Sequence, residues 1–76
     1  MFTPDLTPFN GGFQLEWNYG DHYLEIEFKE THMNTYMVLD GAEFLYDNCS
    51  SETMLTVMQT FFTSMRKKGF KDDTYP

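Results

Sequence analysis

Residues 12–29 read GFQLEWNYGDHYLEIEFK, and this stretch decides the fold. Apolar and polar residues alternate on both sides of Gly20-Asp21, a dipeptide that suits a two-residue type II′ hairpin turn. If that turn forms, Tyr19 lies opposite His22, and every pair further out follows from that match. Because successive side chains of a strand point to opposite faces, a one-residue slip would mix the two faces. The stretch therefore predicts a β-hairpin with one apolar and one acidic face.

The two faces of this predicted hairpin differ sharply in composition. The apolar face holds Phe13, Leu15, Trp17, Leu24, Ile26 and Phe28. The other face holds Gln14, Glu16, Asn18, Tyr23, Glu25 and Glu27. We expect the apolar face to pack on a helix, with Trp17 buried near Phe61 or Phe62.

A second hairpin is predicted over residues 35–47, where TYMVL and AEFLYD flank Asp40-Gly41, a strong type I′ signal. Both of its faces are apolar, so the pattern alone does not determine which face points toward the helix. We favour a core set of Met37, Leu39, Phe44 and Tyr46. That choice leaves Tyr36, Val38 and Leu45 on the same side as the acidic residues of the first hairpin.

A helix is predicted from Glu52 to about Lys68. A serine at the end of residues 48–51 is a suitable N-cap, and Glu52 lies in the first turn, where the helix dipole favours an anion. Gly69 is a natural residue to end the helix. The apolar residues at helical spacing are Met54, Leu55, Met58, Phe61, Phe62 and Met65.

These elements predict an α+β fold of order ββββα: a four-stranded antiparallel meander with one C-terminal helix packed on one face. Residues 1–11, which hold two prolines and no periodicity, are expected to form an extended N-terminal arm. Residues 12–70 form a single domain, and residues 71–76 a C-terminal tail.

Composition narrows the class of protein. A chain of 76 residues is one small domain, and its eight Phe, five Tyr and six Met supply a dense core. Cys49 is the only cysteine, which excludes an internal disulfide and a cysteine cluster for zinc. No apolar run reaches the roughly 20 residues that a membrane span needs, and no signal-peptide pattern is present. These features favour a cytoplasmic protein.

The charge distribution indicates the kind of partner. The net charge is −7, and residues 1–65 contain ten acidic residues against Lys29 alone. Such a surface repels nucleic acids and anionic membranes and attracts basic surfaces. We therefore expect a protein partner with a basic surface, without direct binding to nucleic acid or membrane.

No residue pattern indicates catalysis or a cofactor. His22, His32 and Cys49 are too few and too scattered for a closed zinc site. Cys49 precedes a helix, where a thiol pKa falls, but no histidine is predicted near it, so a small residue filling the corner is the simpler interpretation. Glu16 faces Glu25 on an open sheet, which lacks the cleft that acid–base catalysis needs. We predict no catalytic, cofactor or metal residues and no enzyme activity.

The acidic face is the candidate binding surface, because like charges directly opposite across strands are destabilising. A face kept only for solubility would be expected to mix charges of both signs, yet Lys29 is the only base nearby. The predicted partner-binding residues are Glu16, Tyr23, Glu25, Glu27, Tyr36, Glu43 and Asp47.

GGFQLEW followed by YLEIEF, at about residues 11–28, resembles a pattern of small uncharacterised bacterial and phage proteins, to which no activity attaches. In size and charge only, the chain also resembles anti-CRISPR-type phage inhibitors, which often block nucleic-acid-binding surfaces. That resemblance implies an inhibitor of a host defence protein, acting in the host cytoplasm if phage-encoded. An antitoxin or immunity-type partner of one cognate protein, or a structural homodimer, is the alternative.

Overall fold

The hairpin at residues 12–29 has the predicted register in the computed structural model, which describes residues 2–71. Tyr19 pairs with His22, and the pairs continue outward as expected. Of the two turn residues only Gly20 has a positive φ, 63°, as a type II′ turn requires. The prediction for this stretch is confirmed.

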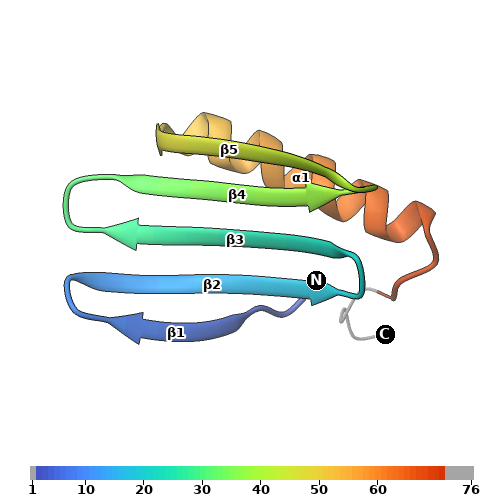
Figure 1. Cartoon of the computed structure of the whole chain (residues 1–76), viewed down its shortest axis with the longest axis horizontal. Coiled ribbons are helices and arrows are strands. Elements are labelled where there is room, and N and C mark those ends of the chain that lie inside the picture. Colours follow the sequence, from blue (N-terminus) through green and yellow to red (C-terminus); the bar gives the residue numbers. More distant parts are fainter. Residues whose placement is uncertain (1, 72–76) are drawn as a thin grey trace.

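Within the described residues the chain forms five strands followed by one helix (Figure 1). In chain order these are β1 (Asp5–Phe9), β2 (Gly12–Tyr19), β3 (His22–Lys29), β4 (Met33–Leu39), β5 (Ala42–Cys49) and α1 (Ser51–Lys67). The strands make one antiparallel sheet in the order β1-β2-β3-β4-β5, so each pairs with its neighbour in sequence. Helix α1 lies behind β4 and β5 in Figure 1 and leaves the front of the sheet open.

The predicted α+β class with one C-terminal helix is confirmed, but the expectation of four strands was wrong. Residues that we expected in an extended arm form β1, which pairs with β2 from Asp5 opposite Glu16 to Phe9 opposite Gly12. We did not predict this strand because it contains Pro8, and proline lacks the N–H that a central strand needs. An edge strand tolerates proline where the missing N–H points to solvent. The part of the predicted tail at residues 72–76 lies outside the described residues.

The second hairpin also has the predicted register and facing, but Phe44, which we expected in the core, is 38% exposed at the edge of the sheet. Asp40 and Gly41 have φ values of 53° and 81°, the two positive angles of a type I′ turn. Tyr36 lies directly opposite Glu25, which places it on the acidic side, whereas Met37 is buried on the helix side. The register shifts between Met33 and Thr35, where β5 bulges near its end.

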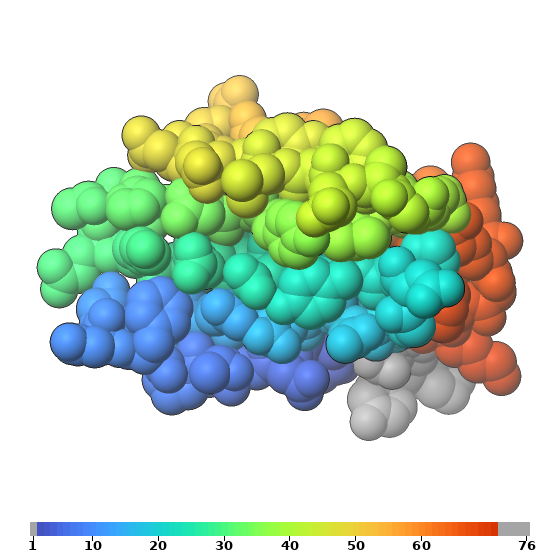
Figure 2. All heavy atoms as spheres, viewed as in Figure 1, coloured from blue at the N-terminus to red at the C-terminus, as the bar shows by residue number. Residues whose placement is uncertain are grey.

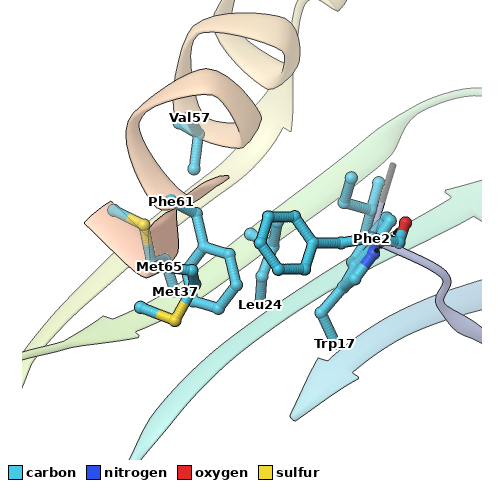
Figure 3. Close-up of a cluster of buried hydrophobic side chains, with 8 residues drawn as sticks. Phe2, Trp17, Leu24, Met37, Val57, Phe61 and Met65 are labelled. Atoms are coloured by element: carbon cyan, nitrogen blue, oxygen red, sulfur yellow. Dashed lines mark hydrogen bonds between the residues drawn. The ribbon is translucent and has the colours of Figure 1, made fainter. Parts of the chain in front are cut away.

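Helix α1 buries a narrower stripe than the sequence suggested. Val57, Phe61 and Met65, spaced four residues apart, are its buried side chains and point toward the sheet (Figure 3). Leu55, which we expected in this stripe, is 53% exposed. Trp17 is 4% exposed and packs edge-on against Phe62 at 5.4 Å between ring centroids, as predicted.

Phe2 reaches into the core from the start of the chain and is fully buried (Figure 3). Its ring stacks on Phe62 and meets Tyr19 edge-on, each at 5.3 Å between centroids. Its carbonyl oxygen accepts a hydrogen bond of 3.2 Å from Trp17 Nε1. The Arg66 guanidinium lies 5.5 Å from the centre of the Phe2 ring. The N-terminal residues therefore fill the space between β2 and the helix.

Both ends of α1 are capped. The Ser50 hydroxyl accepts a 3.1 Å hydrogen bond from the Thr53 N–H, which satisfies an otherwise unpaired donor of the first turn. At the other end Gly69, with φ 92°, donates to the Arg66 carbonyl, and Phe70 donates to the Met65 carbonyl. This pattern is a Schellman motif, as expected for a glycine just beyond a helix.

Candidate protein-binding face

The face of the sheet that points away from α1, which we call the outer face, collects the predicted binding residues. Figure 2 looks onto this face and shows side chains of all five strands side by side. Pairing places Glu16 opposite Glu25, Glu25 opposite Tyr36, and Tyr23 opposite Val38. Pairing places six predicted residues on this face, namely Glu16, Tyr23, Glu25, Glu27, Tyr36 and Glu43, and Asp47 follows on β5 where the register shifts.

Strand β1 adds an acidic residue that the sequence reasoning missed. Asp5 lies opposite Glu16, which lies opposite Glu25, so three carboxylates form a row across β1, β2 and β3. Neighbouring strands are about 4.8 Å apart, so each carboxylate has a like charge beside it. The signal available in the sequence was the Asn10-Gly11 turn followed by a matching strand, which places residue 5 opposite residue 16.

Hydrogen bonds from neutral side chains hold four of the glutamates on this face. The Tyr23 hydroxyl donates to Glu25 at 2.7 Å, and the Tyr36 hydroxyl donates to Glu43 at 2.6 Å. The Gln14 amide donates to Glu16, and the Asn34 amide donates to Glu27 at 3.1 Å. A carboxylate has about four acceptor positions, so one such bond orients it and leaves others for a partner. These donors fix the carboxylates without neutralising their charge.

The pKa values of both tyrosines on the outer face are raised. Burial raises the pKa of Tyr23, and so do its hydrogen bond to Glu25 and the charges of Glu25 and Glu16. The hydrogen bond to Glu43 raises the pKa of Tyr36, with smaller effects from burial and from the charges of Glu43 and Glu25. Both phenols therefore stay protonated and keep donating to their carboxylates.

A hollow marks one end of the outer face. It has a volume of about 410 Å³ and lies between the β1–β2 and β3–β4 turns, where Glu27 and Lys29 line it beside Asn10 and His32. Glu30 also lines it, and His32 Nδ1 lies 2.9 Å from the Thr31 hydroxyl. Across the strands themselves the face carries acidic and aromatic side chains.

The residues weighed for metal or thiol chemistry have structural contacts. His22 Nδ1 accepts a hydrogen bond of 3.4 Å from the Asp40 N–H, and its ring meets Phe70 edge-on. Cys49 lies at the end of β5 with its Sγ 3.3 Å from the Thr35 hydroxyl. Across residues 2–71 no three His, Cys, Asp or Glu side chains gather closely enough to hold a metal ion.

Comparison of the chain with protein-family models, curated proteins and solved structures finds no match. The resemblance of residues 11–28 to small bacterial and phage proteins therefore stays a prediction. In the described part of the chain, no helix has the length and apolar character to cross a membrane.

Proposed function

We propose that the protein is a non-enzymatic protein-binding module whose outer face covers a basic surface of a partner protein. The observation that carries this proposal is the row of directly opposed carboxylates at Asp5, Glu16 and Glu25. Like charges in that arrangement cost stability. A face that retains them, and fixes them with neutral donors, is better explained by binding than by solubility alone.

The partner class follows from charge. Surfaces that bind the nucleic-acid backbone are rich in Lys and Arg, and an acidic face complements them. Orientation of Glu25 by Tyr23, and of Glu43 by Tyr36, reduces the ordering cost when a partner's cations bind. This supports an inhibitor that occupies the nucleic-acid-binding surface of a host defence protein, as anti-CRISPR-type inhibitors do. An antitoxin or immunity-type complex uses the same complementarity and is the alternative.

The apolar side chains of the outer face give a homodimer less support. Leu45 is 65% exposed, but Val38 is half-buried and the Tyr36 hydroxyl is bound to Glu43. A stable symmetric interface needs on the order of 1,000 Å² of well-packed contact. Two copies would also bring two acidic faces together, at a net charge of −7 each.

The test of this function uses a triple variant and a charge-matched control. Glu16→Gln, Glu25→Gln and Glu27→Gln remove three charges from the outer face. Asp21→Asn, Glu30→Gln and Glu52→Gln remove three charges from turns and from the start of the helix. A partner captured from host lysate should bind the control almost as tightly as the wild type and the outer-face variant at least about tenfold more weakly. Equal losses in both variants would mean that only net charge matters and would contradict the proposal.

A further inference from the structure

The two edges of the sheet differ in how open they are to another strand. β1 has five residues with Pro8 among them, two features that protect an edge. β5 has eight residues, Ala42–Cys49, with the sequence AEFLYDNC. It contains neither proline nor lysine. Phe44 is 38% exposed and Leu45 is 65% exposed, on opposite faces of this strand. An added strand beside β5 would cover both side chains.

The turn between β4 and β5 determines which backbone groups of β5 point outward. In a hairpin closed by a two-residue turn, the flanking pair exchanges hydrogen bonds, and bonded and non-bonded pairs then alternate. Here the flanking pair is Leu39 with Ala42. The N–H and C=O groups of Glu43, Leu45 and Asp47 therefore point toward the free edge, where a further strand would bind them.

The side chains beside this edge define the chemistry of the added strand. Glu43 and Asp47 flank Leu45 along the outer face, so they favour two cations on either side of an apolar residue. On the inner face a hollow of about 310 Å³ lies between β5 and α1, lined by Tyr46, Glu52, Thr53, Thr56 and Val57. Side chains that point inward from the added strand would meet this hollow and the exposed ring of Phe44.

We propose that β5 binds an extended basic segment of the partner as a sixth, antiparallel strand. Lys or Arg lies opposite Glu43 and Asp47, an apolar residue lies opposite Leu45, and the residues between them are apolar and face the inner hollow. The proposal rests on the proposed function, since it takes the partner to be basic. A second copy fits worse, because antiparallel pairing of β5 about Leu45 would place Glu43 of one copy opposite Asp47 of the other.

The test uses a blocked heptapeptide, Thr-Lys-Val-Leu-Val-Lys-Thr, titrated into the isotope-labelled protein and followed by NMR. The amide signals of Glu43, Leu45 and Asp47 should shift most and become protected from hydrogen exchange. A control peptide has the same sequence but is N-methylated on the backbone of both lysines and of the leucine. It keeps all side chains but loses the three backbone N–H donors that would bond to β5. It should bind at least about tenfold more weakly. A peptide with glutamate in place of both lysines should show no binding.

A protein variant tests the same edge from the other side. Leu45→Pro removes an outward N–H while the bonds to β4 remain, and it should weaken peptide binding at least about tenfold. If this variant fails to fold, the N-methylated peptide still decides the question. The Glu16→Gln, Glu25→Gln and Glu27→Gln variant should bind the peptide within a few-fold of the wild type.

Four outcomes would overturn the inference. Equal affinity for the N-methylated peptide, or no binding of the parent peptide, would exclude strand addition. Shifts confined to β1, β2 and β3 would place the cations on the outer face, which would leave the proposed function standing and the edge unused. Protection of the Leu45 amide in a dimer of the free protein would assign the edge to a second copy.

Discussion

Phe2 shows how much a single residue near the start of the chain contributes to the core. It is fully buried, contacts Tyr19 and Phe62, and binds Trp17 through its carbonyl oxygen. Its ring closes the gap between β2 and α1 that the sheet and helix alone would leave. Phe2 and strand β1 are therefore part of the folded domain.

We predict that Phe2→Ala lowers the free energy of unfolding by about 3–5 kcal/mol, the usual cost of removing a buried aromatic ring. A domain of this size has about 5–15 kcal/mol in total, so the variant should be marginally folded. Urea denaturation followed by Trp17 fluorescence measures the change. Phe9→Ala, on the edge strand β1, should cost clearly less. A Phe2→Ala midpoint equal to that of the wild type would contradict the packing described.

Tyr23 gives a prediction for alkaline pH. Its pKa is raised in the fold above the ordinary value near 10, chiefly by burial and then by Glu25. The folded state therefore holds the phenolic proton more tightly than the unfolded state. Its contribution to stability is present below about pH 10 and is lost as the pH rises toward the raised pKa.

The expected result is a steeper loss of stability above about pH 10 for the wild type than for Tyr23→Phe, which has no proton to lose. Denaturation midpoints at several alkaline pH values provide the comparison. Tyr46→Phe serves as a control, because Tyr46 lies on the helix side of the sheet. Parallel curves for wild type and Tyr23→Phe would show that the fold does not raise the pKa of Tyr23.

At the scale of elements, Gly12 sets how closely β2 approaches β3. A Cβ added at this position would collide with the carbonyl oxygen of Phe28. A Cβ at Gly69, the residue that ends α1, meets no atom within 4 Å, and only its φ of 92° opposes a side chain. The two glycines are therefore required for different physical reasons.

We predict that Gly69→Ala costs about 1–2 kcal/mol, the penalty of a left-handed backbone with a side chain. Gly12→Ala should cost more, because the start of β2 must move away from the backbone at the end of β3. Thermal or urea unfolding of the two variants ranks them. The reverse order would mean that the end of β2 shifts without disturbing the sheet.

The sequence predicts most elements, because two-residue turns and helix caps are local signals. Gly20-Asp21 and Asp40-Gly41 determine the register of both predicted hairpins, and both registers are confirmed. Strand β1 escaped prediction because Pro8 argues against a strand unless its edge position is known. Leu55 was assigned to the buried stripe because helical spacing does not show where on the sheet α1 lies.

In the candidate site, too, residues with a local sequence signal were predicted and residues without one were missed. Residues on β2 and β3 were correctly grouped on one face, since the turn and the alternation determine that face. Asp5 was missed, because it joins this face only through the pairing of β1 with β2, and Pro8 argued against that strand. The hydrogen bonds from Tyr23 and Tyr36 to glutamates depend on side-chain conformations and come from the structure alone.

In the whole molecule, the hydrophobic core and the row of carboxylates lie on opposite faces of the sheet. All buried apolar residues lie between the sheet and α1 or beside them, so the outer face is free to carry charge. The Glu16→Gln, Glu25→Gln and Glu27→Gln variant should therefore unfold with a free energy equal to that of the wild type or up to about 1 kcal/mol higher. Urea denaturation at low and high salt tests this, since added salt should narrow the difference. A clearly less stable variant would show that these carboxylates support the fold.

We propose that the outer face binds a basic partner, and that claim predicts how fast the two proteins associate. Opposite charges accelerate association, and salt screens that acceleration. Association of the captured partner should be measured at low and high salt for the wild type, the outer-face variant and the charge-matched control. We predict that the outer-face variant associates more slowly at low salt and loses most of its salt dependence, while the control keeps both. Equal association rates at low salt for all three proteins would contradict the claim.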